Sequence, residues 1–447
     1  MPIKTHHADI ENRIRHTLIT YGPLSAKKIC FELNISQPVF SRNIKKLFPN
    51  IVIFGKSRAT LYAHKRTIAG VTNKLPVYEI SEIGKVTLLA TLHPVEPKGF
   101  FIESTISKIH FKYFENLPYF LDDLRPSGFL GRLVAKQYDF LHHPQDISLW
   151  SDSDCLRFLS QYGWDMIGNY IIGDDALQSY LNKKTNIELL IKERERESRY
   201  ENMAKHVLDM GPAGSSAAGE QPKFLAIKEP ETPVIVKFSP PIKHAVSKRL
   251  ADLLVCEHIA HTVLNDIGIT ATESQILTNN AKRVFLELKR FDRCKNGRIG
   301  VVSLQTLNLE FVGSTKSWSD VSESLYERGL ISQGIHNNIC FLDLFGRLIA
   351  NTDRHLGNIS FITKNLEILK LAPVYDMLPM SYIPQYEQMR TTTMEQPIIT
   401  PRDLPYMTRA IDTAIKFWQD VHDNPLITMS FKKIASNNSK ILEMINY

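Results

Sequence analysis

The chain has 447 residues, of which 43% are hydrophobic and 23% are charged, a composition typical of a globular protein with more than one domain. It contains no uninterrupted apolar run of about 18 residues, so we expect no membrane span, and its first residues lack the apolar stretch of a signal peptide, which predicts a cytoplasmic location. The five cysteines lie far apart without a Cys-x-x-Cys pair, which argues against a disulfide framework and a zinc site.

The net charge of +7 is concentrated near the N-terminus. Residues 1–66 hold twelve Lys and Arg against three acidic residues, a net charge of +9, whereas the remaining residues carry −2. A short basic segment is typical of a nucleic-acid-binding module. A solvated basic face has the same composition, so charge alone does not separate the two interpretations.

The pattern of apolar residues favours a DNA-binding domain over residues 1–67. Three short helices are predicted, the first over residues 11–21, the second capped by Ser25 and the third capped by Ser36. A hairpin with a basic tip at 55–58 follows, which is the order of a winged helix-turn-helix. A three-helix interaction module without a nucleic-acid role is the alternative. The residues expected to contact DNA are Gln37, Ser41, Arg42, Lys45, Lys56 and Arg58.

Residues 68–190 are predicted to form strands between 71 and 92 and at 99–102, and an apolar helix near 128–134. No group of side chains in this region indicates a chemistry. The charged run 192–197 is interpreted as a solvated helix face that joins two domains.

A small-residue segment and a lysine-bearing strand predict a site for ATP. Gly214 and Gly219 have the spacing of a Walker A loop, but Glu220-Gln221 stand where that motif requires Lys and Ser/Thr. We therefore interpret this segment as a glycine-rich loop that covers phosphates, with a flexible linker as the alternative. Lys237 ends the strand that follows and can pair with ATP phosphates.

The helix predicted from about residue 245 to 265 stands where the acidic partner of a kinase lysine is found. Asp252 and Glu257 both lie on it. The sequence does not choose between them.

The strongest signal follows an amphipathic helix around residue 341. Asp353 and Asn358 have the D-x-x-x-x-N spacing of a protein kinase catalytic loop, in which the Asp accepts the proton of the substrate hydroxyl and the Asn binds magnesium. Asp376, eighteen residues after Asn358, ends an apolar segment and is the expected second magnesium ligand. Each residue alone is compatible with a turn or a helix cap, but their order and spacing predict phosphoryl transfer.

In these residues the chain resembles the HipA-type serine/threonine kinases, the toxin components of bacterial toxin–antitoxin systems. The resemblance covers roughly residues 75–447 and rests on four motifs, which are Gly214-Ser215 to Pro222-Lys223, Arg290-Phe291-Asp292-Arg293, Asn351-x-Asp353-x-His355-x-x-Asn358 and Val374-Tyr375-Asp376. With the predicted winged helix-turn-helix in front, the chain is most similar to the branch called HipH or YjjJ.

The resemblance implies an enzyme that uses ATP and Mg²⁺ to phosphorylate a Ser or Thr hydroxyl of a cellular protein, such as a translation component, and thereby inhibits growth. It implies that Asp353 is catalytic, that Asn358 and Asp376 bind the metal, and that Ser215 or Ser216 is autophosphorylated. The family usually has Glu where this chain has Lys289, at a position that holds adenine through its backbone. The residues expected to bind the nucleotide are Gly214, Ser215, Ser216, Gly219, Lys223, Lys237, Lys289, Phe291 and His355.

The predicted fold class is α+β. We expect a winged helix-turn-helix at 1–67, a HipA-like N-terminal subdomain at 68–190, a kinase N-lobe with the glycine-rich loop at 191–295, and a helical C-lobe with the catalytic loop at 296–447. The expected partners are a protein substrate and duplex DNA, with no membrane, and the sequence identifies no antitoxin. Two alternatives are a DNA-binding regulator whose kinase domain only senses a nucleotide, and a magnesium-dependent DNase. Intact Lys237, Asp353, Asn358 and Asp376 favour the active kinase.

Overall fold

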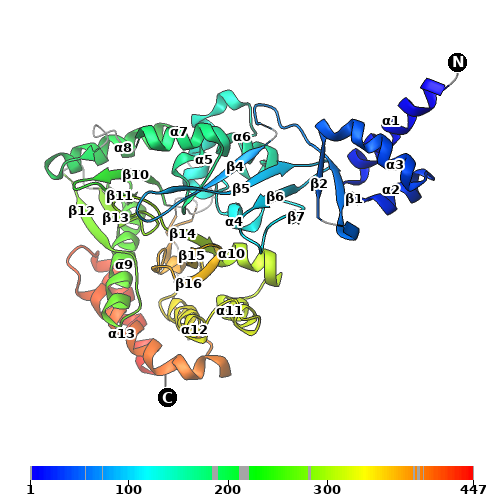
Figure 1. Ribbon diagram of the computed structural model, residues 1–447. Helices are drawn as coiled ribbons and strands as arrows, with labels where there is room; N and C mark the ends of the chain where they lie inside the picture. The colour runs from blue at the N-terminus through cyan, green and yellow to red at the C-terminus, as the bar shows by residue number, and fades with distance from the viewer. Residues whose placement is uncertain are drawn as a thin grey trace. The chain divides into compact units, whose positions relative to one another are not determined.

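The computed structural model describes residues 3–55, 57–72, 74–183, 190–210, 221–279, 283–385, 388–389, 393–395 and 397–445. The chain divides into two compact units, one of residues 1–81, 85–125 and 149–185, and the other of residues 82–84, 126–148 and 186–447. Both combine helices with β-sheets (Figure 1), in agreement with the predicted mixed fold class. In the described residues, no helix has the length and apolar character needed to cross a membrane.

The first unit begins with three helices and a small antiparallel sheet. The elements are α1 (Ile3–Tyr21), β1 (Leu24–Ser25), α2 (Ala26–Leu33), α3 (Gln37–Ile44), β2 (Ile51–Phe54) and β3 (Leu61–His64), with strand order β1-β3-β2. The second and third helices and the hairpin lie where the sequence predicts them, and the first helix, predicted at 11–21, begins earlier, at Ile3. Ile14, Leu18, Ile29, Phe40 and Ile44 are buried between them, so the apolar periodicity of this segment corresponds to a shared core.

One of the two predicted helix caps is wrong. Ser25 accepts a hydrogen bond from the Lys28 amide at 3.3 Å and caps α2. Ser36 occupies the cap position of α3 but makes no side-chain cap bond. Pro38 is the second residue of α3, and because proline has no amide hydrogen, one of the two donors that a capping serine uses is missing.

A five-stranded antiparallel sheet completes the first unit. Its order is β7-β6-β5-β4-β8, formed by β4 (Leu75–Ile80), β5 (Val86–Pro94), β6 (Phe100–Ser104), β7 (Tyr113–Phe114) and β8 (Tyr170–Ile172), and helices α4 (Tyr119–Asp122), α6 (Asp152–Tyr162) and α7 (Asp174–Lys183) accompany it. Phe54 and Ala63 of the small sheet share a buried cluster with Val95 and Phe101. The β2–β3 hairpin is therefore packed against the larger sheet.

The second unit contains a five-stranded sheet of order β12-β13-β11-β10-β9. Its strands are β9 (Leu190–Ile191), β10 (Lys223–Lys228), β11 (Thr232–Phe238), β12 (Ser274–Thr278) and β13 (Val284–Lys289). Helices α5 (Gly128–Gln137) and α8 (Arg196–Met210) contact β10, and the long α9 (Ala245–Asp266) contacts β11, β12 and β13. Thus β11 lies in the middle of the sheet, next to α9.

The charged run 192–197 is less solvated than predicted. Arg196 is 5% exposed and contacts the buried Glu287 at 3.4 Å, and Tyr200 donates a hydrogen bond to the same carboxylate at 2.7 Å. A buried charge requires an opposite charge or hydrogen bonds. Arg196 therefore fixes the start of α8 on the sheet, while most of its charged neighbours face solvent.

The remainder of the second unit is mainly helical. A small sheet of β14 (Gly300–Ser303), β15 (Ser360–Lys364) and β16 (Glu367–Leu371) is accompanied by α10 (Leu304–Leu307), α11 (Trp318–Glu327), α12 (Gln333–Leu348), α13 (Met407–Asp423) and α14 (Met429–Glu443). Phe341 and Phe345 on α12 are buried, as are Phe417 and Trp418 on α13. The segment from Asn351 to Asn358 lies between α12 and β15, so a packed helix and a buried strand hold both of its ends.

Candidate active site

Lys237 is a buried lysine near the end of the central strand β11. Its ammonium lies 2.6 and 2.7 Å from the two carboxylate oxygens of Glu257 on α9, and it also contacts the carboxylate of Asp376. Asp252, the other acid considered from the sequence, instead accepts hydrogen bonds from the amide and hydroxyl of Thr428. Glu257 is therefore the acid that pairs with Lys237.

The ammonium of Lys237 and each of the two carboxylates stabilise one another electrostatically, whereas burial and the charge of Asp376 raise the pKa of Glu257. Burial alone would lower the pKa of Lys237, but the charges of Asp376 and Glu257 raise it above its ordinary value of 10.5. Burial would raise the pKa of Asp376, but the charges of Lys237 and Lys223 hold it below its ordinary value of 3.8. Asp376 is therefore ionised and Lys237 protonated at neutral pH.

The backbone of Asp376 adopts an unusual conformation. Its φ is 52°, in the left-handed region that residues other than glycine rarely occupy. Its amide donates a hydrogen bond to Glu257 at 3.3 Å. Strained backbone of this kind persists where surrounding contacts impose it, and it clusters at functional sites.

Asp353 is exposed, but its backbone is held from both sides. Its amide donates to Oδ1 of Asn351 at 3.0 Å, and its carbonyl oxygen accepts a hydrogen bond from Nδ2 of Asn358 at 2.8 Å. Asn351 and Asn358 are both buried. The Asp353 carboxylate thus faces solvent from a fixed backbone, as a proton acceptor for an external substrate requires.

Tyr375 connects the Asp376 segment with the catalytic loop. Its hydroxyl donates to the carbonyl oxygen of Gly357 at 2.7 Å and lies 2.7 Å from the Ser360 hydroxyl. In the sequence, Tyr375 directly precedes Asp376, and its partner Gly357 directly precedes Asn358. The structure therefore brings the two predicted magnesium ligands into neighbouring segments.

The other predicted nucleotide-binding residues lie in different surroundings. Lys223 is opposite Lys237 in the β10–β11 register, and its charge lowers the pKa of Asp376. The Phe291 ring stacks on Tyr375 with ring centroids 5.7 Å apart. The Lys289 side chain extends to Glu273 at 2.8 Å, and the His355 ring accepts a hydrogen bond from the Gly357 amide within its own loop.

Some predicted residues lie outside the described part of the chain. These are Gly214, Ser215, Ser216, Gly219 and Lys56, and the side chain of Arg58.

The remaining residues expected to contact DNA are all exposed. Gln37, Ser41 and Arg42 lie on α3, and Lys45 follows directly.

The described residues contain no group of three or more His, Cys, Asp or Glu side chains suited to a metal ion.

The roles of Asn351 and Tyr375 were not predicted from the sequence. Both lie inside the motifs that carried the family resemblance, and Asn351 precedes Asp353 by two residues, a spacing from which a side chain can bond the following backbone. The two-residue spacing could therefore have predicted the hydrogen bond from the Asp353 amide to the Asn351 side chain. The Tyr375 contact joins residues 18 apart through tertiary structure, and no local pattern indicates it.

Comparison with known proteins gives consistent matches along the chain. Residues 71–181 match the family model described as YjjJ-like toxin, middle domain, and residues 215–424 match the HipA-like C-terminal domain. Toxin YjjJ of Escherichia coli (strain K12) is 36% identical over 440 residues, which are 96% of this chain and 97% of that protein.

Two solved structures are also similar. One is the Shewanella oneidensis MR-1 toxin–antitoxin complex of HipA, HipB and its operator DNA, with a TM-score of 0.51 and 14% identity over 82% of this chain and 95% of that chain. At this identity the likeness shows the fold alone. The Helicobacter pylori proinflammatory kinase CtkA has a TM-score of 0.34 and 14% identity over 50% of this chain and 90% of its own.

The charge cluster predicts a specific pH dependence of stability. Because the pKa of Asp376 is lower in the folded chain than in the unfolded chain, its carboxylate stabilises the fold above its ordinary pKa of 3.8, and this contribution is lost as the pH falls. Urea unfolding of wild type and Asp376→Asn, from about pH 6 down to about pH 2, should show the difference in unfolding free energy shifting in favour of the variant. A difference that stays constant over this range would contradict the assigned charge of Asp376.

Proposed function

The chain belongs to the family of YjjJ-like toxins with a HipA-like C-terminal domain, and from this premise we propose that it is a serine/threonine protein kinase that uses ATP and Mg²⁺. The proposed substrate is a hydroxyl group of a cellular protein, and its phosphorylation inhibits growth. The observation that carries the proposal is the contact of Lys237 with both Glu257 and Asp376. A strand lysine paired with a helix glutamate, beside a metal-binding aspartate, is the arrangement on which protein kinases depend.

The donor groups at the site fit magnesium. Mg²⁺ takes hard oxygen ligands, and one or two protein side chains suffice when phosphates supply the others. Asp376 offers a carboxylate, and because the Asn358 amide nitrogen bonds to the Asp353 carbonyl, its amide oxygen is the atom that remains for a metal. When bound, Mg·ATP supplies the phosphoryl group and neutralises the charge that develops during transfer.

The side chains of the chain then have distinct tasks. Lys237 holds phosphate oxygens, with Glu257 fixing its position. Asp353, exposed on a fixed backbone, accepts the proton of the attacking hydroxyl. The backbone at Lys289 and Phe291 is the proposed contact for the adenine base, and the Phe291 ring stacks on Tyr375, next to Asp376 in sequence.

We also propose that residues 1–67 are a winged helix-turn-helix that binds duplex DNA. The support is the net charge of +9 in residues 1–66 and the exposure of Gln37, Ser41 and Arg42 on α3. The Shewanella oneidensis HipA structure contains HipB and operator DNA. This chain carries its own basic module, which supports a role in regulating its own gene.

The kinase proposal predicts different defects for the two aspartates. Asp353→Ala should abolish phosphoryl transfer but leave Mg·ATP affinity within about twofold of wild type, because this residue acts on the substrate hydroxyl. Asp376→Ala should weaken Mg·ATP binding about tenfold or more, because a metal ligand is lost. Isothermal titration calorimetry with ATP measures both.

The matched control for this experiment is the same titration in excess EDTA. The difference between wild type and Asp376→Ala should largely disappear, since it depends on the metal. Equal losses of Mg·ATP affinity in both variants would contradict the assigned division of roles.

The DNA-binding proposal predicts a strong dependence on salt. Affinity of the full-length chain for duplex DNA should fall steeply as salt increases, and Arg42→Ala should weaken binding and reduce the slope of log K against log salt by about one if it contacts a phosphate. Lys45→Ala should act similarly. Fluorescence anisotropy with labelled duplex DNA measures these affinities.

The neighbouring Lys46 provides a matched control, because its ammonium contacts Glu11 within the domain. Lys46→Ala changes the net charge as much as Lys45→Ala but should affect DNA affinity less. Asp353→Ala should bind DNA as wild type does. Binding that is insensitive to salt would count against the proposal.

A further inference from the structure

Asp343 is a buried carboxylate that the proposed chemistry does not use. It lies on α12 and is 5% exposed. One of its oxygens accepts a hydrogen bond from the Ser319 hydroxyl of α11 at 2.8 Å, and the other lies 3.2 Å from Nε of Arg354. A carboxylate buried this deeply requires such partners. Any role of Asp343 in function therefore acts through its partners, Ser319 and Arg354.

Arg354 extends this contact into the catalytic loop. It directly follows Asp353, and its guanidinium also donates a hydrogen bond to the carbonyl oxygen of Asn351. The Asn351 side chain in turn holds the Asp353 amide. The residues on both sides of Asp353 are thus tied to α12 through Asp343.

A glycine in α12 makes room for the arginine. Gly346 is buried in the interior of this helix, where glycine is an unfavourable residue. A Cβ atom at position 346 would lie 2.6 Å from Cδ of Arg354. For a Cβ atom at the exposed Gly334, near the start of the same helix, the nearest atom outside the adjoining residues and the helix backbone is the Ser332 hydroxyl oxygen, at 3.9 Å. The path of Arg354 across α12 therefore explains why position 346 is a glycine.

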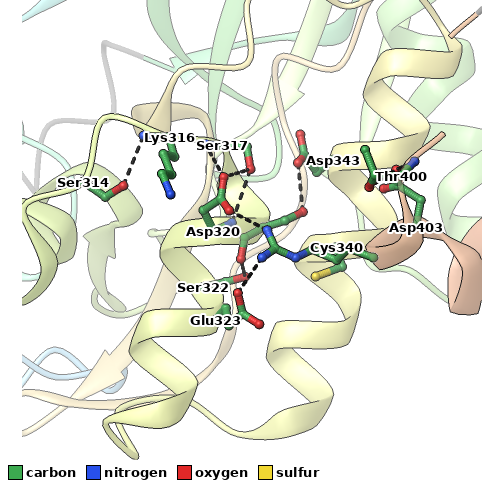
Figure 2. Close-up of polar contacts among 12 residues, drawn as sticks. Ser314, Lys316, Ser317, Asp320, Ser322, Glu323, Cys340, Asp343, Thr400 and Asp403 are labelled. Atoms are coloured by element: carbon green, nitrogen blue, oxygen red, sulfur yellow. Dashed lines mark hydrogen bonds and ion pairs between the residues drawn. The ribbon is translucent and has the colours of Figure 1, made fainter. Parts of the chain in front are cut away.

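A helix cap and an ion pair fix the first turn of α11, the helix that carries Ser319. Figure 2 shows the side chains of Ser317 and Asp320 directed toward each other, and Asp343 of α12 in a separate contact. Ser317 caps α11, because its hydroxyl accepts a hydrogen bond from the Asp320 amide at 3.3 Å while the Asp320 carboxylate accepts one from the Ser317 amide at 3.2 Å. Arg402 contacts Asp320 and also lies 2.7 Å from Glu323. The end of α11 that presents Ser319 to Asp343 is consequently anchored from two directions.

We infer that Asp343 is a positioning residue for the proposed phosphoryl transfer, which it serves by fixing the catalytic loop through Arg354. The Asp353 carboxylate must be exposed to meet a protein substrate, so it cannot be fixed by packing of its own side chain. Its position depends on the backbone, and the Asp343–Arg354 contact holds that backbone on the α12 side. Ser319 orients the Asp343 carboxylate by a hydrogen bond, and Gly346 leaves the space that the Arg354 side chain occupies.

A pair of glycine substitutions on one helix tests this inference, which rests on the proposed function. In the full-length chain, Gly346→Ala should lower kcat for phosphoryl transfer about 10- to 100-fold, because a displacement of about 1 Å near the reacting groups costs this much. The KM for Mg·ATP should change much less than kcat, since Lys237, Glu257 and Asp376 lie on other segments and only Asn358 of the proposed nucleotide and metal contacts lies in the displaced loop. Gly334→Ala makes the same chemical change on α12 without meeting Arg354, and it should leave both constants unchanged.

Two further variants separate positioning from general damage to the fold. Asp343→Asn keeps the side-chain volume but removes the charge, and it should also lower kcat more than it changes the KM for Mg·ATP. In an Arg354→Ala background, which lacks the obstructing Cδ, Gly346→Ala should cause little further loss, because the two substitutions act on one contact. If Gly346→Ala does not fold, Asp343→Asn decides the question by the same two constants.

The outcomes distinguish this inference from the proposed function. Equal kcat for Gly346→Ala and Gly334→Ala, in a chain whose wild type transfers phosphate, would overturn the inference alone. A Gly346→Ala loss that remains undiminished in the Arg354→Ala background would overturn it as well. A wild-type chain without any transfer would overturn the proposed function, and the inference with it.

Discussion

The second unit depends on one buried positive charge. The ammonium of Lys237 on β11 requires opposite charge, and Glu257 and Asp376 provide it from positions 20 and 139 residues away in sequence. Because these contacts are short and the lysine is buried, they fix α9 against the sheet and bring the segment after β16 to the same place. The left-handed backbone of Asp376 is maintained by the same contacts. The cluster is therefore a structural constraint on three elements as well as the centre of the candidate active site.

The segment from Asn351 to Asn358 differs from the Lys237 cluster in that its central side chain, Asp353, is exposed. Lys237 and Glu257 are buried and their charges act on each other, whereas Asp353 is exposed, as the proposed attack by an external hydroxyl requires. The cost of exposure is that side-chain packing cannot hold the residue in position. Asn351 and Asn358 hold the loop through its backbone, and Asp343 holds it through Arg354. In both places the position of a reactive group is determined by residues that do not themselves react.

The sequence predicts local features well and long-range partners poorly. Helices α1, α2 and α3 follow from apolar spacing, and the order of Lys237, Asp353, Asn358 and Asp376 follows from motif spacing. The choice between Asp252 and Glu257 does not, because α9 is buried on nearly all sides and both acids are buried, so periodicity gives no exposed face to exclude either. Ser36 makes no side-chain cap bond, and Pro38 removes one of the two amides that it could have used. Arg196 is buried against a partner, Glu287, that lies 91 residues away. The close approach of the Arg354 side chain to Gly346 depends on tertiary packing, so no local sequence pattern predicts it.

The most direct test of the account is transfer of the γ-phosphate of ATP to protein. The full-length chain, with Mg²⁺ and γ-labelled ATP, is incubated with a bacterial lysate, and labelled proteins are separated and hydrolysed to identify the modified residue. We predict label on serine or threonine of a protein with wild type, and none with Asp353→Ala. Equal labelling by both, or nucleic acid cleavage by wild type without any protein labelling, would contradict it.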